Sequence, residues 1–182
     1  VYGQPLVRQY LRACIANHQV GQGYLFTGLA GSNKTQAAYA FAQAILCEKD
    51  GCGQCDDCVR VMRRKHPDVH FLSPGGASGY LIEQIRQVVA EIGLAPIRAK
   101  KKVYIFDRAD LLGTYAANAF LKTLEEPPDD VVIILLGRTA ESILPTIVSR
   151  CQVVPFRHIP ASEAAGIVVQ NTGVSEQRAV YA

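Results

Sequence analysis

Short, fully apolar segments alternate with longer helical patterns along most of this sequence, and this alternation limits the fold more than any other feature. Val103 to Phe106 and Val131 to Leu136 are apolar throughout, which is typical of strands in a parallel sheet covered on both faces. Further strands are expected over 23–28, 69–72 and 152–155, and helices over 34–46, 81–92 and 115–124. This order predicts a three-layer α/β domain with right-handed crossovers.

The pattern changes at residue 158. Residues 161–170 and 175–182 predict short helices with no further strand, and the last helix is interrupted by the end of the sequence. We therefore expect an α/β domain over 1–157 and the start of a truncated helical domain over 158–182.

Composition excludes several classes of protein. Apolar residues make up 49% and charged residues 19%, so general disorder is excluded, and a net charge of +3 is too small to indicate a nucleic-acid binder. No apolar run approaches the roughly 18 residues that span a bilayer, and residues 1–4 do not resemble a signal peptide. We expect a soluble cytosolic protein that does not contact a membrane.

The turn after the first predicted strand matches the sequence motif of a phosphate-binding loop at all but one of its characteristic positions. It carries Gly28, Gly31, Ser32, Asn33, Lys34 and Thr35 in the sequence GLAGSNKT. In such loops backbone N–H groups surround phosphates, the lysine reaches the terminal phosphates, and the threonine binds Mg²⁺. Asn33 replaces the glycine expected before the lysine. Asn tolerates left-handed backbone angles, but its side chain adds bulk near the phosphate, so binding of ATP and Mg²⁺ is doubtful. An ordinary strand-turn-helix junction is the alternative.

A second acidic position follows the strand at residues 103–106. Asp107 stands where nucleotide hydrolases hold Mg²⁺, but Arg108 occupies the next position, where a glutamate usually orients the attacking water. A cation cannot accept the proton of that water. Asp110 is expected to point elsewhere, and the alternative role for Asp107 is to end a strand.

Four of the six cysteines lie close together, at Cys47, Cys52, Cys55 and Cys58. Four thiolates in a short loop suit a tetrahedral structural Zn²⁺ site, and glycines at 51 and 53 permit the tight turns. An iron–sulfur cluster also uses four thiolates and is one alternative. A loop without metal is the other.

Two stretches are rich in basic residues. One, at residues 60–66, follows the cysteines, and the other, at residues 98–102, precedes the strand at 103–106. Solvated surface is the default interpretation, and weak, non-specific contact with DNA phosphates is the alternative. The four histidines have no spacing typical of metal ligands, and no role is assigned to them.

Three segments resemble parts of a known family, the clamp-loader subunits of bacterial DNA polymerase III. Residues 118–128 (NAFLKTLEEPP) closely resemble a signature of these subunits, and residues 144–151 (LPTIVSRC) are similar to the segment that ends in their Ser-Arg-Cys motif. The cysteine quartet after the phosphate-loop helix is similar to their zinc module, although the gap between Cys47 and Cys52 is shorter than expected, which puts Cys47 in question. The resemblance covers about residues 1–157.

The resemblance implies an AAA+ fold with a five-stranded parallel sheet, a small helical lid starting near residue 158, and a C-terminal collar domain beyond this sequence. It implies a hetero-pentameric ring with gamma/tau and delta subunits that places a sliding clamp on primed DNA, in the cytoplasm at the nucleoid-associated replisome. In that ring Arg150 is the arginine finger for a neighbour's ATP, and Thr139 falls at the sensor position.

The altered residues would serve the chain's own nucleotide, whereas Arg150, which would serve a neighbour's, is intact. This asymmetry favours a subunit with little or no ATPase activity of its own. A gamma/tau-type ATPase is the alternative, and a zinc-stabilised DNA-binding module is the second alternative.

Overall fold

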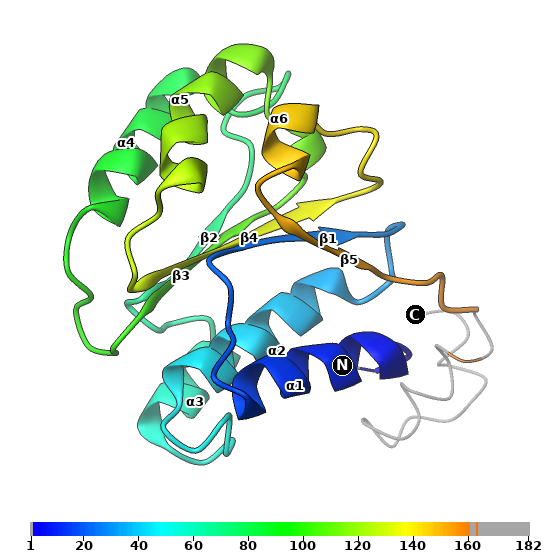
Figure 1. Cartoon of the computed structure of the whole chain (residues 1–182), viewed down its shortest axis with the longest axis vertical. Coiled ribbons are helices and arrows are strands. Elements are labelled where there is room, and N and C mark those ends of the chain that lie inside the picture. The colour runs from blue at the N-terminus through cyan, green and yellow to red at the C-terminus, as the bar shows by residue number, and fades with distance from the viewer. Residues whose placement is uncertain (1, 161–162, 164–182) are drawn as a thin grey trace.

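The structure, a computed structural model, describes residues 2–160 and 163 (Figure 1). The helices expected over 161–170 and 175–182 lie outside the described residues, and so does most of the expected lid over 158–182. Within the described residues, no helix combines the length and the apolar character needed to cross a membrane.

A five-stranded parallel sheet forms the centre of the molecule, with the strand order β2-β3-β4-β1-β5. Each predicted strand is present, with ends within one residue of the prediction. The strands are β1 (Gly23–Thr27), β2 (Val69–Leu72), β3 (Lys102–Phe106), β4 (Val131–Gly137) and β5 (Gln152–Pro155).

Helices cover both faces of this sheet, which confirms the predicted three-layer α/β class (Figure 1). One face packs against α1, α2 and α3, and the other against α4, α5 and α6. The helices are α1 (Pro5–Ala16), α2 (Lys34–Leu46), α3 (Asp56–Met62), α4 (Ile82–Ile92), α5 (Thr114–Glu125) and α6 (Pro145–Val148), with a 3-10 turn, η1, at Ala109–Leu111.

The apolar runs of β3 and β4 follow from this double cover. Val103 and Ile105 face the layer of α1 and α2, whereas Tyr104 and Phe106 face α4 and α5. Successive side chains of a strand point to opposite faces, so a strand with both faces buried must be apolar at every position. Every residue of β3 and β4 is buried.

The parallel sheet has two unlike edges. The loop at residues 28–35 follows the end of β1, and Asp107 follows the end of β3, so both lie at the carboxyl edge of the sheet. Arg150 precedes β5 and Glu125 precedes β4, which places both at the amino edge. Ligands of open α/β sheets bind at the carboxyl edge.

Candidate functional site

The loop at residues 28–35 joins the end of β1 to the start of α2, the context that a phosphate-binding loop requires. The N–H of Gly28 donates to the carbonyl oxygens of Gly137 (3.2 Å) and Arg138 (2.9 Å). Gly31 and Asn33 have φ angles of 79° and 65°, in the left-handed region. Asn33 therefore adopts the backbone conformation that a glycine would supply at this position, and it begins α2 there.

The side chain of Lys34 is bound to its own loop. Its Nζ donates to the carbonyl oxygens of Gly28 (2.6 Å) and Leu29 (2.8 Å) and lies 3.3 Å from Ser32 Oγ. Burial lowers the pKa of Lys34, and the nearby carboxylates of Asp107 and Asp110 offset this only in part. An ammonium group has three donors, so these contacts use its full capacity in this state of the loop.

The N-terminal segment fastens the same loop. Gln4 is buried, and its Nε2 donates to the carbonyl oxygens of Ser32 (3.1 Å) and Arg157 (2.7 Å), while its Oε1 accepts from the N–H of Arg157 (3.1 Å). Asn33 Nδ2 also donates to the Tyr2 carbonyl at 3.3 Å. One amide thus links the loop to the chain beyond β5, a contact that the sequence analysis did not anticipate.

A cavity of about 680 Å³ lies beside the loop and is lined by residues 29–36, 107, 108, 110, 136–138 and 158. Tyr80 donates its hydroxyl to the Asp107 carbonyl at 2.6 Å and so fixes the start of the acidic turn. Arg108 adopts a left-handed backbone (φ 47°), and its Nε is 3.9 Å from the Asp107 carboxylate. The cavity thus brings Lys34, Thr35 and Asp107 together with the arginine that replaces the expected glutamate.

Asp110 lines the same cavity, which corrects the expectation that it would point elsewhere. Its Oδ1 atom is buried and has no hydrogen-bond partner among the described residues. The short η1 turn, which begins directly after Arg108, brings the residue back toward the loop. A turn of three residues is too short to leave a periodic pattern in the sequence.

Residues 136–138, at the end of β4, line the cavity, and Thr139, the expected sensor residue, follows them directly. Its Oγ1 accepts from the N–H of Ser142 at 3.3 Å, and its carbonyl accepts from Ser142 Oγ at 2.8 Å. In this structure the Thr139 hydroxyl is used within a local turn.

Arg150 lies at the opposite edge of the sheet from the loop. The Arg150 carbonyl lies beside Gly23, the first residue of β1, since a Cβ added to Gly23 would be 3.1 Å from it. The loop begins after Thr27, the last residue of β1. At about 3.3 Å per residue, the length of β1 separates Arg150 from the loop by roughly 13 Å. The arginine therefore does not contribute to the cavity of its own chain.

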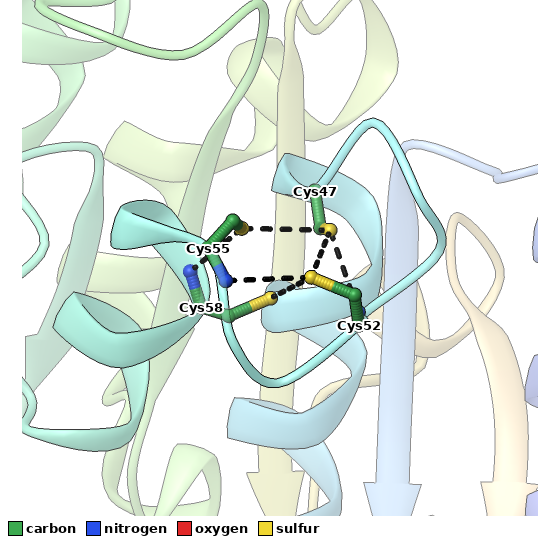
Figure 2. Close-up of side chains that lie close together, drawn as sticks. All are labelled: Cys47, Cys52, Cys55 and Cys58. Carbon is green, nitrogen blue, oxygen red and sulfur yellow. Dashed lines mark hydrogen bonds between the residues drawn. The ribbon is translucent and has the colours of Figure 1, made fainter.

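The four clustered cysteines converge, with all four sulfurs within 4.8 Å of one another (Figure 2). Cys47 Sγ lies 3.7 Å from the sulfurs of both Cys52 and Cys55, and Cys52 Sγ lies 4.0 Å from that of Cys58. Tetrahedral Zn–S bonds of about 2.3 Å place ligand sulfurs roughly 3.8 Å apart. The group could therefore hold a single metal ion, and Cys47, the residue in question, is one of its four members.

Backbone N–H groups around the cysteines favour thiolates. The N–H groups of Lys49 and Cys52 point at Cys47 Sγ (3.3 and 3.4 Å). Burial raises the pKa of Cys47, but these N–H groups and that of Gly51 outweigh it and hold the pKa at about 6. Burial raises the pKa of Cys58 to about 12. A metal must displace the proton of Cys58, so the affinity for metal falls as the pH falls.

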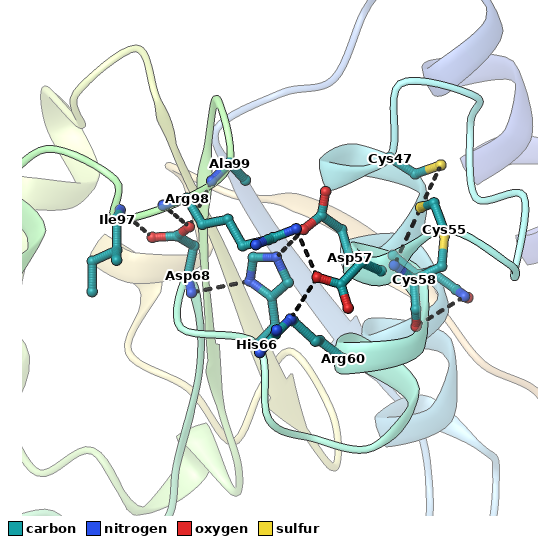
Figure 3. Close-up of polar contacts among 12 residues, drawn as sticks. Cys47, Cys55, Asp57, Cys58, Arg60, His66, Asp68, Ile97, Arg98 and Ala99 are labelled. Carbon is teal, nitrogen blue, oxygen red and sulfur yellow. Dashed lines mark hydrogen bonds and ion pairs between the residues drawn. The ribbon is translucent and has the colours of Figure 1, made fainter.

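A polar network joins the cysteine loop to the edge of the sheet (Figure 3). Arg98 Nε donates to Asp57 Oδ1 at 2.5 Å, and the same oxygen is 3.3 Å from Nε2 of buried His66. His66 Nδ1 accepts from the N–H of Asp68 at 3.1 Å, so Nε2 carries the ring proton. The Asp68 carboxylate accepts three N–H groups, from Ile97 (2.6 Å), Arg98 (2.8 Å) and Ala99 (2.8 Å).

This network includes His66, a residue to which the sequence analysis assigned no role. The side chain is fully buried, and both ring nitrogens have partners, so it is a satisfied structural histidine. His66 contacts Asp57 and Asp68, and no sequence motif relates a histidine to partners at these two distances along the chain.

The basic stretches are partly neutralised within the chain. Arg60 and Arg98 pair with Asp56 at 2.9 and 2.7 Å, and Arg64 lies 5.0 Å from the ring centre of Tyr39. Lys102 is buried and donates to the carbonyl of Ile92 at 3.0 Å, at the end of α4. These contacts leave a smaller free basic surface than the sequence suggests.

Comparison with known proteins gives a consistent family. A family model described as "DNA polymerase III, delta subunit" matches residues 3–160. The chain is 36% identical over 157 residues to the DNA polymerase III subunit delta′ of Bacillus subtilis and 34% identical over 170 residues to its subunit tau. These matches cover 85% and 91% of the chain, but 47% and 30% of the relatives, so the chain spans half or less of their length.

A solved structure shares the fold. A DNA polymerase III gamma subunit-related protein of Thermotoga maritima aligns with a TM-score of 0.65 at 23% identity, over 94% of this chain and 57% of that protein. The match supports the AAA+ P-loop fold expected from the sequence.

Proposed function

Because the chain belongs to the DNA polymerase III delta-subunit family, we propose that it is the N-terminal part of a delta-prime-type clamp-loader subunit. In this role it completes the ATP site of a neighbouring subunit through Arg150 and hydrolyses little or no ATP itself. Its partners are gamma/tau and delta subunits, a sliding clamp and, through the complex, primed DNA, in the cytoplasm at the nucleoid-associated replisome.

The separation of Arg150 from the phosphate loop carries this proposal. The arginine lies at the amino edge of the sheet and the loop at the carboxyl edge, about one strand length apart. A guanidinium at that distance cannot reach a phosphate bound in its own loop. It can reach one bound to an adjacent subunit, and an arginine finger donated in this way contributes roughly 10³–10⁵ to the rate.

The residues around the cavity support a weak or absent activity of the chain itself. Arg108 stands at the position that needs a proton acceptor, and Lys34 is engaged with its own loop. The proposal assigns a degenerate nucleotide site to the loop, the acidic turn and the end of β4. Its residues are Gly28, Gly31, Ser32, Asn33, Lys34, Thr35, Asp107 and Thr139. Asp110 brings a second carboxylate to the cavity, and Arg108, between Asp107 and Asp110 in the sequence, lines the same cavity with a positive charge.

The cysteine group is proposed as a structural Zn²⁺ site. Sulfur spacings of 3.7–4.0 Å suit one tetrahedral ion and leave no space for several iron atoms among the four sulfurs. With all four ligands supplied by protein, a metal here would retain no open position for chemistry. It would close a loop that has few apolar side chains of its own.

Substitution of Arg150 tests the proposed function. The full-length subunit with Arg150→Ala is assembled with its ATPase partners, clamp and primed DNA, and ATP hydrolysis is measured. We expect the rate at the site that receives Arg150 to fall about 10³-fold or more, which removes that site's share of the total. Arg86→Ala is the matched control, because Arg86 is exposed on α4 and pairs only with Glu83 among the described residues.

Two results would reject the proposal. One is an unchanged hydrolysis rate in the loader that contains Arg150→Ala. The other is brisk hydrolysis by the purified chain alone, which would favour the gamma/tau-type ATPase to which the chain is also similar.

A further inference from the structure

Arg150 has a defined set of partners within its own chain. Its Nη1 donates to the carbonyl of Thr146 at 2.6 Å and lies 3.3 Å from Ser149 Oγ, both in or beside α6. Its Nη2 donates to the carboxylate of Glu125, the last residue of α5. The side chain is 29% exposed, so the guanidinium is held at the surface and remains accessible.

The hydrogen-bonding capacity of the guanidinium is only partly used. A guanidinium has five N–H donors, and the contacts to Thr146, Ser149 and Glu125 use three of them. The Nε atom is buried and has no partner among the described residues. The side chain is therefore oriented by its own chain, and one Nη2 donor has no partner among the described residues and can bind an incoming anion.

The position of Glu125 is costly unless it has a cationic partner. A carboxylate in the last turn of a helix faces the negative end of the helix dipole, which is unfavourable. The turn that follows is fixed as well, because Gln22 Nε2 donates to the carbonyl oxygens of Pro127 (3.2 Å) and Pro128 (3.0 Å). Glu125 thus lies just before a hydrogen-bonded turn, and its ion pair with Arg150 offsets the unfavourable dipole interaction.

We propose that Glu125 is the positioning residue for Arg150: its carboxylate fixes the guanidinium in the orientation that meets a neighbour's phosphate. This inference rests on the proposed function of Arg150. Without the carboxylate, the guanidinium keeps only contacts from its own short helix and samples more orientations. Misplacement of a catalytic group by about 1 Å can reduce a rate by 10²-fold, so loss of the restraint lowers turnover.

A double-mutant cycle in the assembled loader tests this inference. The four full-length subunits are the parent, Glu125→Ala, Arg150→Ala and the variant with both changes. For Glu125→Ala we expect the kcat of the site that receives Arg150 to fall about tenfold, with KM for ATP within twofold. In the Arg150→Ala background the same change is expected to have no further effect, because Glu125 acts only through Arg150.

Two further variants sharpen the comparison. Glu126→Ala is the control, since Glu126 is adjacent, exposed and not bonded to Arg150 in the described structure. It is expected to leave kcat unchanged. Glu125→Gln keeps an acceptor oxygen without the charge, and an intermediate kcat is expected. Thermal unfolding of each isolated subunit checks that the fold is intact.

The outcomes separate the inference from the proposed function. If Arg150→Ala lowers hydrolysis but Glu125→Ala does not, the positioning role is wrong while the finger role stands. If Glu125→Ala lowers hydrolysis equally in both backgrounds, or raises it, the positioning role is likewise refuted. If Arg150→Ala itself has no effect, the proposed function fails first.

Discussion

Asn33 keeps a backbone shape that glycine usually provides, at the position where this loop departs from the common pattern. Its φ of 65° and ψ of 22° lie in the left-handed region, and its side chain reaches the Tyr2 carbonyl. Asn is among the few non-glycine residues that tolerate this region. The residue thus keeps the left-handed turn and adds a side chain among those that line the cavity.

Substitutions at position 33 should reveal this conformational demand. Asn33→Ala is expected to lower the free energy of unfolding by about 1–2 kcal/mol, because alanine is disfavoured in the left-handed region, whereas Asn33→Gly should cost clearly less. Denaturant unfolding of the three proteins measures the difference. Asn118→Ala, at an exposed position in helix α5, is the control and should be nearly neutral. Equal losses for Asn33→Ala and Asn33→Gly would contradict the argument.

Sequence reasoning at this scale identified residues by type and spacing, and it missed residues that act through distant partners. Lys34, Asp107 and the four cysteines follow recognisable local patterns. Gln4 bonds to residues 28 and 153 positions away, and Glu125 to one 25 positions away. No local pattern records such pairs, and only the parallel sheet, which aligns the starts of β4, β1 and β5, brings Glu125 and Arg150 together.

The cysteine loop and α3 contribute few side chains to the apolar core. Of the residues in α3, Cys58 and Val61 alone are buried, and the rest of the connection is polar, through Asp57, Arg98 and His66. A segment held in this way needs another source of order, and a bound metal supplies it.

Metal removal is expected to loosen this segment alone. The purified protein should contain about one zinc per chain and no iron. After chelation, amide exchange should speed up across residues 47–62 while β3 and β4 remain protected, because their residues are fully buried in the sheet. Cys55→Ala should lose the zinc, whereas Cys14→Ala, outside the group, should retain it. Iron, or no metal, in freshly prepared protein would overturn the assignment.

Element prediction succeeded where burial is two-sided or the helical pattern is long. In β3 the residues after Lys102 are all apolar, β4 is apolar from Val131 to Leu136, and α4 carries a regular apolar face. The short helices α3 and α6 were not predicted, since four to seven residues contain too few periods. Helix α1 was also not predicted, although its buried residues Val7, Leu11, Cys14 and Ile15 have helical spacing.

For the molecule as a whole, the distribution of charge argues against tight DNA binding by the chain alone. Several residues of the basic stretches have acidic, aromatic or carbonyl partners, including Arg60, Arg98, Arg64 and Lys102. Charge already paired within the protein releases fewer counterions on binding DNA. Contact with DNA would then come from the assembly.

The isolated chain is expected to bind primed DNA no more tightly than the non-specific range of roughly 10⁻⁴–10⁻⁶ M at physiological salt. Fluorescence anisotropy of labelled primed DNA measures this, with the assembled loader as the positive control. Nanomolar binding by the chain alone would support the zinc-stabilised DNA-binding module instead.

The opposite placement of Arg150 and the phosphate loop gives the molecule a polarity. Subunits whose donor and acceptor lie on different sides associate head to tail, through heterologous contacts, and cannot pair about a two-fold axis with both contacts satisfied. Under the proposed function, each copy with a degenerate pocket would remove one working interface from a closed ring. Such a ring would have a distinct first and last working site, on either side of the missing one.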